Sequence, residues 1–257
     1  MAKSNQEKKI FTASDQLLWG VHPVAQQLHR QPGLINEIFI AKREGKKNQE
    51  IIDLARAKGV KVKFSGAISI KGEGRINHQG VVARINKTET ISENDFLDLL
   101  EQEKKPPFLI ALDSIQDPHN LGAILRSAAA AGVSGVIVPR DRSAPLGGTA
   151  AKVAAGAMAM LNICQVTNLS AFLQKIQEKG VWVFGTVKDE GQAIFESDLS
   201  GSICLVIGNE EKGIRPLIAK QCDVRLTIPM PGQFESLNAS VAAGIALFEV
   251  VRQRRLP

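Results

Sequence analysis

The chain has 257 residues, of which 44% are hydrophobic and 23% are charged. These ordinary fractions exclude a disordered, collagen-like or disulfide-scaffold protein, and the length suffices for one large domain or two modest ones. The formal net charge of +6 is unevenly distributed, since residues 1–88 hold 16 Lys and Arg against 7 Asp and Glu, whereas residues 89–257 hold 16 against 19. We therefore expect a polyanionic partner for the N-terminal third.

The composition also predicts a reduced, cytoplasmic setting, with neither a metal site nor a membrane span. The three cysteines are odd in number and form no C-x-x-C pair, and the four histidines show no metal-ligand spacing. The N-terminus lacks the apolar run of a signal peptide, and no apolar run approaches the ~18 residues of a membrane helix. With 5% aromatic residues and no tyrosine, a surface that stacks many bases is not expected.

Residues 1–17 are predicted to form a flexible tail and residues 18–88 a small α/β domain. One helix is expected to begin at Pro23. A second is expected over residues 48–58, and Gly59 follows its last residue and ends it. Strands are expected at residues 37–41, 60–64 and 80–85. The basic segment 71–78 contains G-x-G but lacks the third glycine and a following helix, so it is not a dinucleotide fingerprint.

Residues 89–107 are acidic, contain one short amphipathic helix and end in two prolines, which predicts a linker. Strand-like and helix-like runs alternate from Phe108 onward, which predicts a parallel sheet with helices on both faces. The expected strands cover residues 108–112, 135–139, 162–166, 181–186, 203–207 and 224–228, and the expected helices cover residues 120–131, 149–158, 169–179, 216–220 and 236–254. Ligands on such sheets bind at the carboxyl ends of the strands.

The loop after the first of these strands reads DPHNLGAILRSA, residues 117–128. Asn120 is expected to cap the following helix, which carries Arg126, and by itself this pattern also suits a plain capped helix with a solvated arginine. Gly122 in the first turn favours the close approach of another backbone, because glycine otherwise weakens a helix.

Two later loops also follow apolar strands. Gly208 and Gly213 bracket charged residues, which suits either an ordinary tight turn or a backbone contact with a ligand. Glu210 between them can accept a hydrogen bond from a hydroxyl or an amide. In the last loop Ser236 is a good N-cap for the final helix, and Asn238 then lies in its first turn. No His or Asp stands at a nucleophile spacing, which disfavours a hydrolase.

Three segments together resemble the three motifs of the SpoU-type (TrmH-like) RNA ribose 2′-O-methyltransferases of the SPOUT class. They are DPHNLGAILRSA, VIGNEEKGI and IPMPGQFESLNASVAAGIALFE, in the family's order and spacing over residues 108–253. The stretch from GVHPVAQQL to NHQGVVARI resembles the ribosomal-protein-like RNA substrate-binding domain of many members. Both parts are most similar to the bacterial enzymes that methylate a guanosine ribose in 23S rRNA. Glu211 departs from the second motif, which often has glycine there, and this bears on the loop's geometry and cofactor affinity.

The resemblance implies a trefoil knot in the sheet domain (residues 108–257), S-adenosylmethionine as cofactor, and a homodimer formed through the knotted domain, with each active site completed near the interface. The implied cofactor contacts are Gly208, Ile228, Leu237 and, as a fourth, Thr186.

The resemblance also makes Arg126 the central catalytic residue, with Asn120, Glu210, Ser236 and Asn238 ordering it and the ribose. A guanidinium scarcely deprotonates in proteins, so we expect Arg126 to bind the target phosphate and the developing oxyanion, and we leave the proton acceptor open.

Phosphate contacts are expected from the basic N-terminal domain, at Lys42, Arg43, Lys46, Lys47 and Arg75. Any one of these side chains taken singly is better explained as a solvated charge, so the prediction concerns the domain as a whole. Two further functions stay open at this point: methylation of a tRNA ribose, and a non-catalytic role as an RNA-binding or ribosome-assembly protein. A nicotinamide dehydrogenase is disfavoured, because the chain lacks the glycine fingerprint and its acidic partner.

Overall fold

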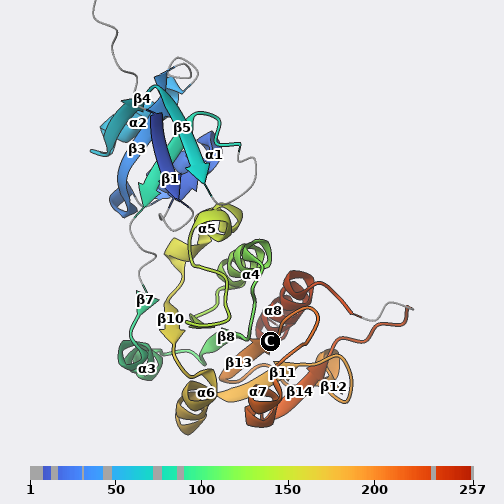
Figure 1. The fold of residues 1–257 in the computed structure, drawn as a ribbon. Helices are drawn as coiled ribbons and strands as arrows, with labels where there is room; N and C mark the ends of the chain where they lie inside the picture. Colours follow the sequence, from blue (N-terminus) through green and yellow to red (C-terminus); the bar gives the residue numbers. More distant parts are fainter. Residues whose placement is uncertain are drawn as a thin grey trace, which may run out of the picture. The chain divides into compact units, whose positions relative to one another are not determined.

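A computed structural model describes residues 8–12, 17–30, 32–42, 48–71, 77–85, 90–232 and 236–255. The chain divides into two compact units (Figure 1). The N-terminal unit comprises residues 1–89 and 145–159, and the C-terminal unit comprises residues 90–144 and 160–257. Each unit has its own sheet and its own hydrophobic core.

The N-terminal unit contains a four-stranded sheet in the order β2 (Leu17–Trp19), β6 (Val81–Ile85), β3 (Ile35–Ala41) and β4 (Lys61–Ser65). Strand β6 runs antiparallel to both neighbours, and β3 and β4 are parallel. Helices α1 (Val21–Arg30) and α2 (Gln49–Ala57) pack on one face, where Leu28, Ile38 and Ile52 are buried together. Gly59 has a φ of +71°, which suits the residue that follows the C-cap of α2.

A parallel pair of strands, β1 (Lys8–Thr12) and β5 (Ala67–Lys71), belongs to the second core cluster of this unit. Phe11 of β1 is fully buried, and its ring meets Phe39 edge-on with the centroids 4.9 Å apart. The predicted flexible tail over residues 1–17 is therefore wrong for residues 8–12. The contacts that order this strand come from residues far along the chain, so no local pattern announces it.

The C-terminal unit is built on an all-parallel sheet of eight strands, which confirms the predicted parallel α/β architecture. Its order is β12 (Gln192–Ala193), β14 (Val224–Thr227), β11 (Trp182–Thr186), β13 (Ile203–Ile207), β8 (Phe108–Leu112), β9 (Gly135–Pro139), β10 (Ile163–Val166) and β7 (Thr90–Ile91). Every residue of β8, β9 and β13 is buried. Burial on both faces explains why these strands read as unbroken apolar runs.

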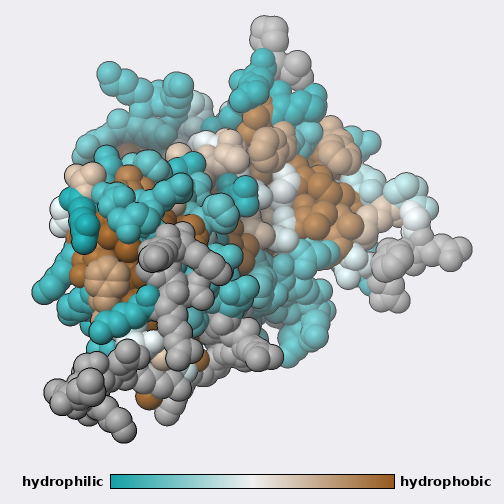
Figure 2. Space-filling model, turned by 90° about the horizontal axis from the view of Figure 1, so that it is seen from above, coloured by the Kyte–Doolittle hydropathy of each residue, from teal (hydrophilic) through white to brown (hydrophobic). Residues whose placement is uncertain are grey.

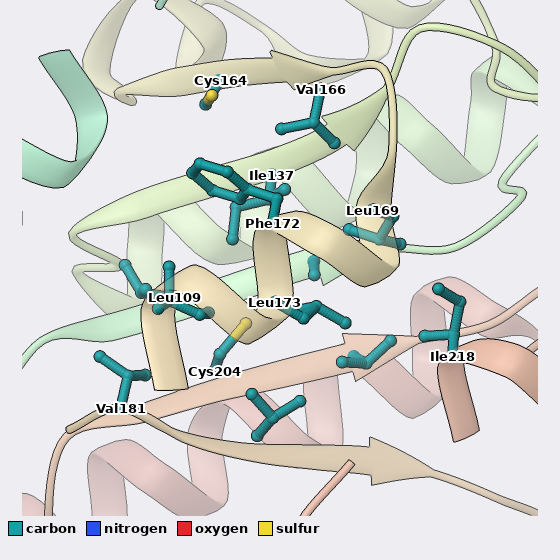
Figure 3. Packing of buried hydrophobic residues seen from close by; sticks show 14 of the residues in the cluster. Leu109, Ile137, Cys164, Val166, Leu169, Phe172, Leu173, Val181, Cys204 and Ile218 are labelled. Atoms are coloured by element: carbon teal, nitrogen blue, oxygen red, sulfur yellow. The ribbon is translucent and has the colours of Figure 1, made fainter. Parts of the chain in front are cut away.

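Helices cover both faces of this sheet. Helices α3 (Glu93–Gln102), α6 (Leu169–Glu178) and α7 (Pro216–Gln221) contribute to one core cluster, and α4 (Pro118–Ala131) and α8 (Ala239–Arg255) pack against each other (Figure 1). Figure 3 shows Phe172 and Leu173 of α6 among Leu109 and Ile137 of the strands.

The stretch predicted as a linker, residues 89–107, is largely packed into the C-terminal unit. Strand β7 pairs with β10, and Phe96 of α3 is 1% exposed in the core. A Cβ at Gly135 would lie 2.4 Å from the Phe96 ring, so α3 depends on a glycine in β9. Ser92 caps α3 by accepting a hydrogen bond from the Asp95 backbone N–H at 3.1 Å.

The predicted helix over residues 149–158 is two pieces, α5 (Gly148–Ala154) and a short 3-10 helix (Ala157–Met160). Between them Ala155 and Gly156 have φ values of +50° and +86°, which interrupt the helical path. Helix α5 packs against β2, so this segment belongs to the N-terminal unit although it lies within the sequence of the expected methyltransferase domain.

In the described part of the chain, no helix has the length and apolar character needed to cross a bilayer. Hydrophobic residues appear only in patches between hydrophilic ones on the face drawn in Figure 2. Exposed apolar side chains do occur on α8, where Val241 is 50% and Phe248 is 49% exposed.

Candidate active site

A cavity of about 590 Å³ lies at the carboxyl ends of β11, β13 and β14. This is where an open parallel sheet is expected to bind a ligand, and the volume suits a small organic molecule. All four predicted cofactor residues line it: Thr186, Gly208, Ile228 and Leu237. Glu210 and Ser236 also line it, whereas Asn120, Asn238 and Arg126 do not.

The loop after β13 forms one wall of the cavity and is folded tightly back on itself. A Cβ at Gly208 would lie 2.2 Å from the carbonyl carbon of Gly213 and 2.3 Å from the nitrogen of Ile214, so only glycine fits there. Asn209 and Gly213 exchange backbone hydrogen bonds of 3.0 and 2.8 Å. Gly213 has a φ of +63°, a second reason for glycine. Glu211, the departure from the family motif, lies exposed in this turn.

Part of the lining is apolar, with Ile207, Ile214 and Leu226 beside Ile228 and Leu237. Four charged residues, Lys188, Glu210, Glu211 and Lys212, also line the cavity, and the turn at residues 208–213 adds backbone groups that can form hydrogen bonds. The hydroxyl of Thr186 donates to the Val206 carbonyl at 3.0 Å, so it is directed toward strand β13. Such a wall suits a ligand with a flat apolar surface and a few hydrogen-bonding groups.

A chain of side-chain hydrogen bonds joins the three loops. Asn120 donates from Nδ2 to Oε1 of Glu210, and Oδ1 of Asn120 accepts from Nδ2 of Asn238 at 3.0 Å. Asn120 is 8% exposed, so these partners satisfy a buried amide. The structure thus brings together three of the five predicted catalytic residues.

Two predicted helix caps are wrong. Helix α4 begins at Pro118 and is capped by Asp117, whose carboxylate accepts from the His119 N–H at 2.8 Å. Proline favours the first helical position because it needs no N–H partner, and Asn120 is thereby left free to bind the other loops.

Ser236 likewise does not cap the last helix, which begins at Ala239. Asn238 takes that role, because its Oδ1 accepts from the Ser240 N–H at 2.9 Å and its carbonyl accepts from the Ala242 N–H. Ser236 is exposed and faces the cavity instead.

Arg126 stands apart from the other predicted catalytic residues. Six residues beyond Asn120 on α4, it lies ~9 Å further along the helix axis and on a different side of it. Its side chain is exposed, and it makes no hydrogen bond or ion pair with any residue that the structure describes. Within one chain, therefore, Arg126 is not part of the cavity.

Sequence reasoning missed Asp113, which directly follows β8 and is fully buried. Its carboxylate accepts from the backbone N–H of Arg215 at 2.8 Å and from Nε of Arg215 at 2.6 Å. The available signal was a charged residue at the end of an unbroken apolar strand, because carboxylates are buried only when they are paired.

Of the predicted RNA-binding residues, Lys42 is exposed, and Arg43, Lys46, Lys47 and Arg75 lie outside the described residues. Some neighbouring positive charge is used within the N-terminal unit, since Lys63 and Arg84 both pair with Glu37. Burial raises the pKa of Glu37, but these two cations together hold it below its ordinary value.

Cys164 and Cys204 are buried in strands, Cys222 is partly buried, and all three are free thiols. Burial raises the pKa of Cys164 and of Cys222 to about 12, so neither is a ready nucleophile.

Comparison with known proteins agrees with the site. Residues 107–248 match the SpoU rRNA Methylase family, and residues 17–91 match the family described as RNA 2′-O ribose methyltransferase substrate binding. The 23S rRNA (guanosine-2′-O-)-methyltransferase RlmB of Vibrio cholerae is 43% identical over 244 residues, which cover 94% of this chain and 98% of that protein.

Solved structures share the fold. An AdoMet-bound rRNA methyltransferase from Sinorhizobium meliloti superposes with a TM-score of 0.72 at 23% identity, covering 97% of this chain and 99% of that one. The SpoU methyltransferase AviRb from Streptomyces viridochromogenes, in complex with AdoMet, gives a TM-score of 0.70 at 24% identity, covering 93% and 90%. From its three loops, its parallel sheet and these matches, the chain belongs to the SpoU rRNA methylase family.

Proposed function

We propose that this protein transfers a methyl group from S-adenosylmethionine to the ribose 2′-hydroxyl of a guanosine in 23S rRNA, in the cytoplasm. The observation that carries the proposal is the 43% identity, over 94% of this chain, to the 23S rRNA (guanosine-2′-O-)-methyltransferase RlmB of Vibrio cholerae. The polar connection among Asn120, Glu210 and Asn238 at the carboxyl edge of the sheet supports it.

The cavity fits the cofactor. Gly208 lets the backbone at Gly213 and Ile214 close the wall, and the apolar side chains of Ile228 and Leu237 offer a surface for the adenine ring. Thr186, Gly208, Ile228 and Leu237 are the residues that would hold it. When bound, S-adenosylmethionine supplies an electrophilic methyl group on a sulfonium, whose departure as a neutral thioether needs no help from the protein.

The work left to the protein is alignment of the ribose and stabilisation of charge. Glu210 and Asn238 fix the amide of Asn120 between them, so its orientation is set before RNA binds. Ser236 offers a hydroxyl at the cavity wall. Arg126, with its planar fork of donors, would bind the target phosphate and the negative charge that develops on the 2′-oxygen.

We propose that a homodimer completes this site. Arg126 is exposed on α4 and does not line the cavity of its own chain, which is understandable if it serves the site of a second copy. Helix α8 offers a contact surface, because Val241 and Phe248 are half exposed and stand seven residues apart on one side of the helix.

A trefoil knot in the C-terminal unit also belongs to this proposal. Strand β13 lies between β8 and β11, the chain then runs outward to β14, and α8 returns to pack on α4 and β13. Such a return path past the loops after β11 and β13 supports a threaded chain.

The two parts of the chain have separate roles in this proposal: residues 18–88 hold RNA, and residues 108–257 bind the cofactor and catalyse transfer.

Two measurements test the function. Titration calorimetry with S-adenosylmethionine should give saturable binding, and its absence would support the non-catalytic alternative. Mapping 2′-O-methyl sites in rRNA and tRNA with and without the gene should show the loss of one guanosine site in 23S rRNA. Loss of a tRNA site instead would identify a tRNA enzyme.

A further inference from the structure

We propose that Asp113 and Ser114 form a clamp that holds the loop of residues 208–215 in its ligand-binding shape, with Asp113 and Arg215 as positioning residues for the cofactor site. This inference rests on the proposed function for the identity of the ligand. It assigns a role to the ion pair between the buried Asp113 and the partly exposed Arg215, neither of which lines the cavity or belongs to the predicted site.

Asp113 is the anchor of the clamp. Its side chain has no solvent exposure, and its two oxygens accept from the backbone N–H of Arg215 at 2.8 Å, from Nε at 2.6 Å and from Nη2 at 2.6 Å. The hydroxyl of Ser114 adds a fourth donor at 3.3 Å. The backbone of Asp113 also donates to the Ile207 carbonyl at 2.8 Å, which extends the pairing of β8 with β13 to the start of the loop.

Ser114 binds the loop at its beginning. Its carbonyl accepts from Nδ2 of Asn209 at 3.2 Å, and its φ of +64° is a left-handed conformation that serine rarely adopts. Such a conformation persists only where surrounding contacts impose it. Two consecutive residues after β8 therefore bind the loop at its beginning, Asn209, and at its end, Arg215.

The loop that Asp113 and Ser114 hold forms one wall of the cavity. Gly208, Gly213 and Ile214 line the cavity, and the close approach of the last two to Gly208 requires the loop to turn back at a fixed place. Asp113 and Arg215 stand behind that wall, so they act on a ligand only through the position of the loop. Asp113 also begins the segment that leads to Asn120, so the clamp ties the cofactor loop to the loop that carries the catalytic amide.

The chemistry of the pair favours a positioning role. The ion pair is weak as a source of stability, because the cost of burying the Asp113 carboxylate offsets much of its attraction to the partly exposed Arg215. The carboxylate instead fixes a position: four donors converge on its two oxygen atoms, and they hold the backbone of Arg215 in place relative to β8.

The experiment compares Arg215→Lys and Asp113→Asn with the full-length wild-type protein by calorimetric titration of S-adenosylhomocysteine, the demethylated form of the cofactor. Lysine keeps the charge but loses the fork, and asparagine loses one acceptor oxygen. We expect the Kd to rise about tenfold or more for each variant, because small displacements of a binding wall are costly. The KM for S-adenosylmethionine should rise correspondingly, with a smaller change in kcat.

Asp223→Asn is the matched control. The Asp223 carboxylate also accepts from a backbone N–H, that of Val183 at 2.7 Å, and from Nε2 of Gln177 at 2.9 Å. It precedes β14, however, and so lies at the amino ends of the strands, whereas the cavity lies at their carboxyl ends. This variant should lower the thermal midpoint and leave the Kd unchanged.

Wild-type affinity in Arg215→Lys would overturn the clamp, even if Asp113→Asn fails to fold. An equal loss of affinity in Asp223→Asn would overturn it as well, since the effect would then be general destabilisation. Absence of binding in the wild-type protein would instead contradict the proposed function.

Discussion

Asn120 illustrates why single residue types matter at this site. A carboxamide can donate and accept at once, so Asn120 bonds to the carboxylate of Glu210 through Nδ2 and to the amide of Asn238 through Oδ1. A carboxylate in its place would face Glu210 with like charge, and an apolar side chain would leave both neighbours without a partner. The loops come together around one amide.

Arg126→Lys tests the arginine at the same scale. Lysine keeps the positive charge but cannot form two parallel hydrogen bonds, so we expect kcat to fall by about 100-fold while the affinity for rRNA changes little. Single-turnover methylation with radiolabelled cofactor gives the rate, and filter binding gives the affinity. Near-wild-type turnover with unchanged RNA affinity would contradict a role for the guanidinium fork.

Gly208→Ala tests the wall of the cavity. Its new Cβ would overlap the backbone of Gly213 and Ile214, so the loop must move, and we expect the Kd for S-adenosylmethionine to rise at least tenfold. Gly201→Ala is the control, since a Cβ at Gly201 meets no atom within 4 Å. Calorimetry on both variants decides, and equal affinities would show that the wall tolerates the shift.

Helix α8 shows how one residue serves two elements. Asn238 caps α8 through Oδ1 and contacts Asn120 through Nδ2. The sequence pattern located this helix well but put its start at Ser236, because Ser and Asn are both good N-caps and only the three-dimensional contacts choose between them.

Asn238→Asp separates the two roles. Aspartate still accepts from the Ser240 N–H and suits the positive end of the helix dipole, so the free energy of unfolding should change by less than about 0.5 kcal/mol. The donor to Asn120 is lost, and we expect methylation to slow about tenfold or more. Asn238→Ala, which loses the cap as well, should lower the unfolding free energy by about 1 kcal/mol. Chemical denaturation and turnover rates together distinguish the roles, and a fully active Asn238→Asp would dismiss the bond to Asn120.

At the scale of the whole molecule, charge and chemistry are divided along the chain. The excess of Lys and Arg lies in residues 1–88, whereas the charged residues that line the cavity, Lys188, Glu210, Glu211 and Lys212, are balanced in sign. Phosphate contacts give affinity that falls with salt, so the basic part should govern the salt dependence of RNA binding.

Lys46→Gln with Lys47→Gln tests this division. We expect weaker rRNA binding and a plot of log affinity against log salt that is shallower by about 0.7 to 0.9 for each phosphate that the variant no longer neutralises. The affinity for S-adenosylmethionine should not change. Lys104→Gln with Lys105→Gln is the control, because these exposed lysines are also adjacent but belong to the C-terminal unit. An unchanged slope in the first double variant would remove these residues from the RNA-binding surface.

The sequence by itself determined the parallel sheet and the three loops at its carboxyl edge. Fully buried strands must be continuously apolar, so β8, β9 and β13 are visible as runs in a single chain. Glycines and amides at fixed spacings then carried the family resemblance, because the backbone turn at Gly208 admits no other residue.

Only the tertiary structure decided how distant residues meet. The burial of Phe11 and Phe96 and the pairing of Asp113 with Arg215 arise from contacts that local pattern does not encode. Asp113 and Arg215 are 102 residues apart, and Asn120 and Glu210 are 90 apart. Periodicity reports which face of an element is buried, but the partner that covers it is selected by packing across the whole fold.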